Sequence, residues 1–444
     1  MKRQAFTFSV LAASMLFLCG CGDRTASDSN QSFDRPNNDR VNPIIEPEPE
    51  WDYYESSNEY IVLQGYNGKD RVVTVPTELD GKPVKRLGLF FSVDNGVTAT
   101  LKIPASVEDI WNIDGGDSLV ELIVDEANPK YYSQDGCIYL KSNPDTYSVN
   151  ELFRCPTGRK GEFVVADGTE WIHSGAFENC RSLTSVKLPE SVKYISNAFI
   201  DCVSLTNVEL PETLSKIGSM AFSGCTSLET LDIPEDANIS AHAFDGTPFL
   251  EKLIEKDPIV VINGILVDGT AVSGEAVIPD GVQIIAYGAF APYDGVNTEL
   301  KKVTFPESCT FIDTGAFLDC EGLEEVIFPE GLWEIGPNAF ENCVSLKNVE
   351  FPSGLVEIGM EAFRGCTGLT SLDIPDGVTE LSWGAFRDCV NLERVSVPDS
   401  VVYTGYIGCF EGCEKVSVTF KGKTYTADNI DEFYAAVEEN SAQE

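Results

Sequence analysis

The stretch AFENCRSLTSVKLPESVKYI, from Ala176 to Ile195, is followed two residues later by AFIDCVSLTNVELPETLSKI, from Ala198 to Ile217. The Ala-Phe pair keeps returning, with its Phe at positions 177, 199, 222, 244, 290, 317, 340, 363 and 386, and a Cys-Phe variant ends at Phe410. Most steps are 22 to 24 residues, one is 27, and one of 46 spans two periods. Self-similarity at a fixed period indicates a repeat protein, in which each unit is one supersecondary element.

Within one unit the apolar residues keep fixed offsets, as in Phe340, Cys343, Leu346, Val349 and Phe351. The alternation Leu-x-x-Val-x-Phe is typical of a short strand, and the proline that follows ends the strand. One unit has an apolar edge that it cannot bury alone, whereas stacked units cover one another. The sequence therefore predicts a mainly β solenoid of about 23-residue units with little helix.

The 444 residues divide into five segments. Residues 1–20 indicate a signal peptide, and residues 21–50 an acidic tether too poor in apolar residues to fold. Residues 51–175 hold divergent repeats, residues 176–420 the regular array, and residues 421–444 a C-terminal cap.

The cap is predicted to contain a short helix over the stretch NIDEFYAAVEE. Asn429 and Glu432 have the spacing of an N-cap and a third helical position. One apolar stripe follows, formed by Ile430, Phe433, Tyr434 and Val437. Such a helix would cover the open end of the stack, where an unpaired strand edge invites association with another chain.

The pattern AFxxCxxLxxVxLPxxVxxI resembles the BspA-like leucine-rich repeats of bacterial surface proteins. Weaker units at residues 60–88, 128–141 and 262–282 resemble divergent repeats of the same family, so the resemblance covers roughly residues 51 to 427. It implies a leucine-rich-repeat solenoid and a role in attachment to host proteins or to other cells. A fold of this kind is a scaffold with many uses, so the residues themselves name no ligand.

The N-terminus has the features of an export signal. Lys2 and Arg3 precede an apolar run from Ala5 to Leu18 that is too short to span a bilayer comfortably. The run ends in LCGC, which resembles the lipobox of bacterial lipoproteins, where a small residue precedes the modified cysteine. Gly20 fits that position and implies lipid attachment at Cys21; a plain secretory signal is the alternative. A lipid would anchor the chain to a bacterial membrane without a spanning helix.

The charge balance argues against one class of partner. The chain has 31 Lys and Arg against 71 Asp and Glu, a formal net charge of −40. Such a field repels phosphate backbones, so we expect no nucleic-acid binding.

Signs of catalysis are also scarce. The two histidines, His173 and His242, stand at different points of their repeats and are expected to be turn residues. The sequence contains no Gly-x-Ser-x-Gly elbow, phosphate loop or His-Glu-x-x-His motif. We expect a protein that is not an enzyme, with no catalytic residue, no cofactor and no metal site.

Eight cysteines stand three residues after the repeat Phe: Cys180, Cys202, Cys225, Cys320, Cys343, Cys366, Cys389 and Cys413. The favoured interpretation is a buried ladder of free thiols in a tight turn. Disulfides are an alternative in an exported chain, but side chains in register lie about one repeat apart, further than a disulfide tolerates. A parallel row also cannot converge on a tetrahedral metal. Cys137 and Cys155, in irregular units, are the candidates for one disulfide.

The outward positions of the predicted strands form a possible binding strip. These positions hold Lys187, Glu209, Asp232, Thr304, Ile327, Glu350, Asp373 and Ser396. They should project from one face as a row, either as a merely solvated surface or as a protein-binding strip, since solenoids use extended faces in this way.

The sequence thus indicates a lipid-anchored protein at the cell surface whose solenoid binds proteins or mediates adhesion. The implied partners are an unidentified protein or glycan of a host or neighbouring cell, and a membrane through the lipid. The alternative is an inert spacer or envelope scaffold without a specific ligand.

Overall fold

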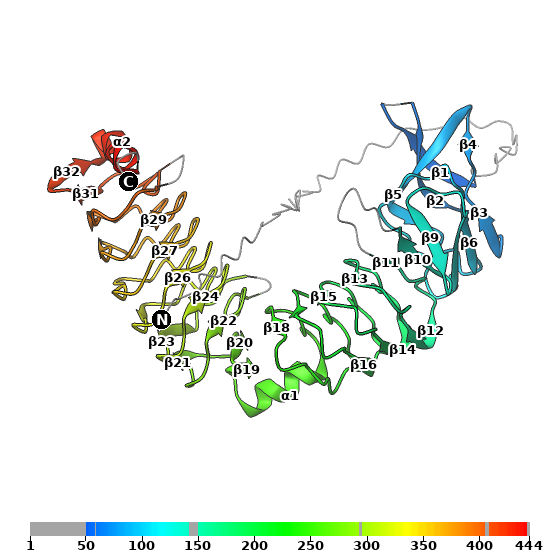
Figure 1. Cartoon of the computed structure of the whole chain (residues 1–444), viewed down its shortest axis with the longest axis horizontal. Coiled ribbons are helices and arrows are strands. Elements are labelled where there is room, and N and C mark those ends of the chain that lie inside the picture. Colours follow the sequence, from blue (N-terminus) through cyan, green and yellow to red (C-terminus); the bar gives the residue numbers. More distant parts are fainter. Residues whose placement is uncertain (1–49, 58, 142–149, 293–294, 405–407, 442–444) are drawn as a thin grey trace, which may run out of the picture. The chain divides into compact units, whose positions relative to one another are not determined.

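The computed structural model describes residues 50–57, 59–141, 150–292, 295–404 and 408–441 (Figure 1). Strands take up 31% of the chain and helices 6%, in about 15 turns of about 23 residues. The predicted class, a mainly β solenoid with a short C-terminal helix, is confirmed. The predicted signal peptide and nearly all of the predicted tether lie outside the described residues.

One coil shows how the repeat folds. In β14 (Ser182–Lys187), Leu183 and Val186 are fully buried while Lys187 points outward. Pro189 follows the strand, and the chain turns into β15 (Tyr194–Ile195), where Ile195 is buried. Each regular coil therefore offers one segment to each of two rows, which we name the long row, after β14, and the short row, after β15.

The long row consists of parallel strands that pair coil by coil. Its sheets are β3 (Val72–Thr74), β6 (Thr100–Ile103) and β8 (Glu121–Val124); β12 (Lys160–Val164), β14 and β16 (Asn207–Glu209); β21 (Gly274–Val277), β23 (Leu300–Thr304) and β25 (Glu325–Ile327); and β28 (Ser371–Asp373), β30 (Arg394–Ser396) and β31 (Ser417–Phe420). An antiparallel strand, β32 (Lys423–Thr426), closes the last sheet.

The short row is built mostly of two-residue parallel strands. They are β13 (Trp171–Ile172), β15, β17 (Lys216–Ile217) and β18 (Asn238–Ile239), then β22 (Ile284–Ile285), β24 (Phe311–Ile312), β26 (Glu334–Ile335), β27 (Glu357–Ile358) and β29 (Glu380–Leu381). Figure 1 shows successive strands of the row side by side in sequence order.

Two of the divergent units form antiparallel hairpins at the start of these sheets. They are β9 (Tyr131–Gln134) with β10 (Cys137–Leu140), which leads into β11 (Glu151–Arg154), and β19 (Val260–Ile262) with β20 (Ile265–Asp268). The second hairpin turns at Asn263 and Gly264, both with positive φ (54° and 74°), which suits the two-residue turn favoured by twisted strands.

The Ala-Phe turns form a third stack inside the coils. The rings of Phe317 and Phe340 lie 4.9 Å apart and nearly parallel, and those of Phe340 and Phe363 lie 5.1 Å apart. The carbonyl oxygen of Phe340 accepts from the backbone N–H of Cys343 at 3.2 Å and from the thiol of Cys366, in the next coil, at 3.1 Å. The cysteine repeats because it supplies this second hydrogen bond in a space with room only for a small side chain.

All twelve cysteines among the described residues are buried free thiols, including Cys137 and Cys155. Burial raises the pKa of Cys320 and of Cys309 to about 12. Both thiols are therefore protonated at neutral pH. Cys19 and Cys21 lie outside the described residues.

One helix within the array was not expected from the sequence. Thr247 replaces the repeat cysteine in the Phe244 unit, and α1 (Pro248–Lys256) follows it. The Thr247 hydroxyl donates to the carbonyl oxygen of Phe244 at 2.6 Å and accepts from the backbone N–H of Leu250 at 3.2 Å. The substitution thus converts the turn into an N-cap, which starts a helix where the other coils continue into the long row.

Both ends of the stack are covered. At the start, β1 (Trp51–Glu55) pairs antiparallel with β2 (Ile61–Tyr66), and β2 pairs parallel with β5 (Lys82–Ser92). β5 in turn pairs with β4 (Glu78–Leu79) and with β7 (Asp109–Ile110). At the finish, the short 3-10 helix η1 (Ala427–Asn429) leads into α2 (Ile430–Ser441).

The helical segment at the C-terminus begins one turn earlier than the sequence predicted. The side chain of Asn429 accepts from the backbone N–H of Thr426 at 2.8 Å, so Thr426 and Asn429 form a capping pair at the start of η1, where the sequence had predicted Asn429 and Glu432. The predicted apolar stripe does face the stack, since Phe433 and Val437 are buried. Phe433 contacts the rings of Phe410 and Phe420.

Candidate functional site

The predicted lipid attachment site, Cys21, lies outside the described residues. Among the helices that the structure does describe, none is long and apolar enough to cross a membrane.

The predicted strip maps to the outward positions of the long row. In the Cα register, Lys187 lies beside Glu209, Thr304 beside Ile327, and Asp373 beside Ser396. All of these side chains are exposed except Thr304, which is half-buried. Asp232 and Glu350 are exposed too, but their coils form no strand in this row. The structure therefore places the strip on one row and divides it into sections.

In the section formed by β14 and β16, Lys187 and Glu209 form an ion pair. Lys187 Nζ lies 2.6 Å from a carboxylate oxygen of Glu209, and this hydrogen bond raises the pKa of Lys187. The same outward position carries apolar side chains in other coils: Val164 is 62% exposed, Val277 61% and Ile327 42%. Val164 and Val277 lie in units without the full Phe-marked pattern, so that pattern does not point to them.

Grooves open at two of the three places where the long row is interrupted. Beyond β16, a groove of about 630 Å³ is lined by Glu209, Glu212, Asp232 and Glu235 among others. Beyond β25, a groove of about 470 Å³ is lined by Glu325, Ile327, Glu330 and Glu350 among others. There, only an isolated bridge between Glu325 and Asn348 continues the pairing. Both grooves are acidic, in keeping with the net charge of the chain.

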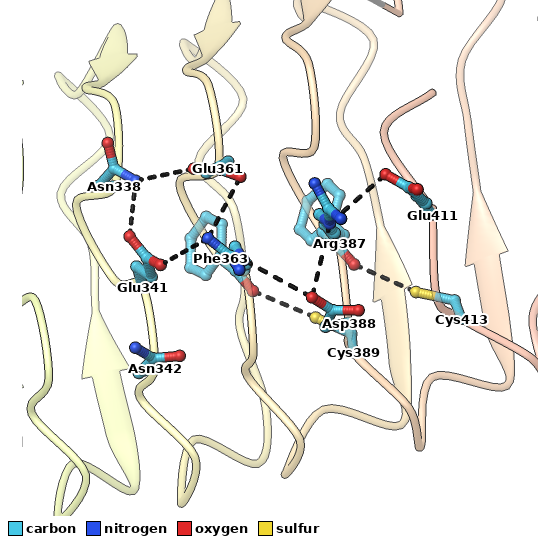
Figure 2. A network of polar contacts seen from close by, with 12 residues as sticks. Asn338, Glu341, Asn342, Glu361, Phe363, Arg387, Asp388, Cys389, Glu411 and Cys413 are labelled. Carbon is cyan, nitrogen blue, oxygen red and sulfur yellow. Dashed lines mark hydrogen bonds and ion pairs between the residues drawn. The ribbon is translucent and has the colours of Figure 1, made fainter. Parts of the chain in front are cut away.

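The turns that carry the Phe stack hold a second set of charged side chains, which pair with one another across coils. Figure 2 shows Asn338 close to the carboxylates of Glu341 and Glu361. Arg364 bridges those two carboxylates at 3.2 and 3.4 Å, and its Nε lies 3.6 Å from Asp388. Arg387 continues the chain of contacts to Asp388 and to Glu411. This network joins successive coils, and each of its four carboxylates contacts at least one of the two arginines.

The outward positions of the short row carry aromatic side chains in one section and carboxylates in another. Trp171, Tyr194 and Lys216 are register neighbours, and the Lys216 ammonium lies 5.9 Å from the centre of the Tyr194 ring. Further along, Phe311, Glu334, Glu357 and Glu380 are register neighbours, and Tyr403 joins the row through an isolated bridge. In each coil the outward residue lies directly before a buried Ile or Leu, or in the equivalent place. This two-residue alternation is the sequence signal by which the outward residues of the short row could have been found.

The carboxylates of the short row are unusual in their electrostatics. Burial, with the nearby charges of Glu357 and Asp313 as smaller causes, raises the pKa of Glu334 to about 7. Burial raises the pKa of Glu357 as well, assisted by Glu380. Ionisation of Glu334 and Glu357 therefore costs the fold, because burial removes water from the charged form and successive coils stack like charges about 4.8 Å apart.

The histidines are turn residues held by carboxylates. His242 has a φ of 59°, and its Nδ1 lies 2.8 Å from Asp245, a hydrogen bond that raises the pKa of the histidine. His173 directly follows β13 and contacts Glu151 through Nδ1. Within the described parts of the chain, no group of three or more His, Cys, Asp or Glu side chains could hold a metal ion.

Comparison with known proteins agrees with the geometry. A family model described as BspA type Leucine rich repeat region matches residues 152–265 and 283–417, more than half of the chain, in six copies. No curated protein matches the chain.

Several solved structures are similar to the chain. A leucine-rich repeat protein from Bacteroides ovatus is 23% identical, with a TM-score of 0.35 over 83% of this chain and 93% of that one. A leucine rich cell surface protein from Faecalibacterium prausnitzii is 20% identical, with a TM-score of 0.31 over 85% and 95%. The pneumococcal vaccine antigen PcpA is 18% identical, with a TM-score of 0.35 over 80% and 91%.

Proposed function

The chain belongs to the family of BspA type leucine rich repeat proteins, and from that premise we propose that it is a surface-displayed binding module without catalysis of its own. Its solenoid would hold a protein or glycan of a host or neighbouring cell. The observation that carries the proposal is the register of the outward side chains: neighbouring coils present them at one repeat spacing, mostly exposed in the long row and mostly half-buried in the short row.

Such rows suit binding for a physical reason. The backbone of each coil is held by hydrogen bonds to the next, so the outward side chains are positioned before any partner arrives. Little conformational entropy is then lost on association. Solenoids use extended faces of this kind for recognition. The long-row strip adds exposed branched side chains at Val164, Val277 and Ile327 to its charged positions.

The proposal includes display by a lipid. The stretch LCGC places Gly20 before Cys21, the arrangement that a lipobox needs, and residues 21–50 would then separate the solenoid from the membrane. The similar protein from Faecalibacterium prausnitzii is described as a cell surface protein, which is consistent with display outside the cell.

A binding screen of the purified protein tests the proposed function. Glycan arrays and pull-downs from host-cell surface proteins should return at least one partner that saturates and that survives about 0.5 M salt, because a purely charge-driven contact is screened at that ionic strength. If no partner in either screen saturates, the solenoid is an inert spacer, the rival that the sequence left open.

A further inference from the structure

The section of the short row from β24 to β29 is a sheet face that no other described part of the chain neutralises. Glu334, Glu357 and Glu380 follow one another in register. Glu380 accepts a hydrogen bond from the hydroxyl of Ser382 at 3.1 Å. Within the described residues, Glu334 and Glu357 have neither an ion pair nor a hydrogen bond to their side chains. Glu341 and Glu361, by contrast, share Arg364. The contrast indicates that the carboxylates of Glu334 and Glu357 are available to a cationic partner from outside the chain.

Aromatic side chains border the carboxylates. Trp333, 47% exposed, stacks against Phe311 with ring centres 6.2 Å apart. Tyr403, 42% exposed, lies beside Glu380 at the other end. Carboxylates and the faces of aromatic rings both attract ammonium and guanidinium groups. The chemistry of this face therefore complements lysine or arginine side chains.

An apolar pocket adjoins the same face. Its volume is about 360 Å³, and its walls include Met220, Tyr287 and Leu318. Thr314 also lines it and directly follows Asp313, whose carboxylate lies close enough to Glu334 to affect its ionisation. The pocket and the carboxylate row thus share the coil of β24, and one bound segment can reach both.

We propose that this face, from the pocket to Glu380, binds an extended cationic segment of a partner protein, with an apolar side chain in the pocket and lysine or arginine side chains over the carboxylates. The inference rests on the proposed binding function and specifies its surface and the chemistry of the partner. The aromatic borders favour an organic cation over a metal ion. No group of described side chains here has the arrangement that a metal needs.

Titration with a short peptide tests the proposal on the purified protein. The probe is a blocked seven-residue peptide with a central leucine between two runs of three lysines, measured by calorimetry at pH 8 and low salt. The variant with Glu334→Gln, Glu357→Gln and Glu380→Gln should lose on the order of tenfold in affinity, as the loss of three half-exposed ion pairs implies. A control with Glu307→Gln, Asp376→Asn and Asp399→Asn removes the same charge at exposed positions elsewhere and should bind within about twofold of the parent.

The pocket has its own matched pair of variants. Tyr287→Ala removes a wall, whereas Tyr54→Ala removes a tyrosine of similar exposure, 46% against 43%, on β1. Of these two variants, only Tyr287→Ala should lower the affinity for the leucine peptide. It should leave unchanged the affinity for a peptide with glycine in place of the leucine. Thermal melts of all four variants show that the coils remain folded.

Equal losses in the two triple variants would reduce the attraction to net charge and overturn the proposal, and so would an absence of peptide binding by the parent protein. The proposed function fails separately, when the partner screen is empty. If the screen finds partners that bind the Glu334, Glu357 and Glu380 variant unchanged, the protein binds through another face and this assignment is wrong.

Discussion

The repeat cysteine and the repeat Phe are joined across coils by one weak hydrogen bond. The thiol of Cys389 lies 3.1 Å from the carbonyl oxygen of Phe363 (Figure 2), and the thiol of Cys413 lies 3.1 Å from that of Phe386. Because a thiol is small and a poor donor, it fills a tight turn and still satisfies an oxygen that already has one partner. The repeated cysteine is thus explained by packing, as the sequence favoured, rather than by redox or metal chemistry.

The thiol ladder predicts chemical protection. In the folded protein the repeat cysteines should resist iodoacetamide at pH 8, because burial raises the pKa of thiols such as Cys320 and closes access to them. After denaturation, all of them should react. Mass spectrometry of the two samples measures the difference, and rapid labelling of Cys343 or Cys366 in the native protein would contradict the ladder.

The Phe stack predicts a large cost for one truncation. Phe363 is fully buried between Phe340 and Phe386, with ring centres 5.1 and 5.5 Å away. Phe363→Ala should therefore lower the free energy of unfolding by about 3–5 kcal/mol, since stacked neighbours cannot collapse into the cavity. Urea titration followed by circular dichroism measures it. Val356→Ala, at a site 42% exposed, should cost less than about 1 kcal/mol; equal costs would refute the assigned register.

At the scale of elements, small changes in the repeat decide which element forms. Thr247 in place of the cysteine produces the N-cap of α1, and the hairpin turn at Asn263 and Gly264 follows shortly after. Together they occupy the 46-residue step between Phe244 and Phe290. The two short-row sheets meet at this point, one ending at β18 and the next starting with the hairpin of β19 and β20.

The carboxylate row makes the stability of its coils depend on pH. The pKa of Glu334 is raised from 4.5 to about 7, so the folded state binds a proton more tightly than the unfolded state. Stability from this group is therefore present below about pH 4.5 and is lost as pH rises through 7. Asp313 and Glu357 face Glu334 and act in the same direction.

Glu334→Gln should remove that dependence, because the amide stays neutral. At pH 8 the variant should be more stable than the parent by on the order of 1–2 kcal/mol, a figure discounted for the partial exposure of the side chain, and at pH 4.5 the two should agree. Urea titrations at both pH values measure it. Glu324→Gln is the control, because a hydrogen-bonded ion pair with Lys347 lowers the pKa of that carboxyl. It should not become more stable than the parent at pH 8. A similar stabilisation there would show that the effect does not come from the carboxylate row.

At the scale of the whole molecule, the described coils form a stack in which each unit mainly contacts its neighbours. The antiparallel strand β1 pairs with β2 at one end and the helix α2 packs on the last coil at the other, so an added strand and a helix cover the two ends. A binding function also depends on where the solenoid is displayed, and the feature that bears on display is the LCGC stretch near the N-terminus.

The lipobox predicts how the protein is anchored. If Cys21 carries a lipid, the native protein should partition into the detergent phase of a Triton X-114 separation, whereas Cys21→Ala should move to the aqueous phase or remain unprocessed. Cys19→Ala is the matched control and should behave like the parent, because Leu18 before it is too large for a lipobox. The same distribution for parent and Cys21→Ala would favour a plain secretory signal.

The sequence by itself determined the solenoid, its period and the place of the buried Phe, Cys and Leu. A unit with one apolar edge can bury that edge only against another unit, and each unit carries the same apolar pattern. Even the outward strip at Lys187 and Glu209 followed from counting within one strand.

Only the tertiary structure decided which outward residues meet. Glu334, Glu357 and Glu380 are 23 residues apart in sequence, and each is an ordinary surface glutamate when considered alone. Stacking brings them to one strand spacing, removes part of their water and places them beside Trp333 and an apolar pocket. Burial and proximity between coils are properties of the assembled stack, which is why the pattern of a single repeat could not reveal this face.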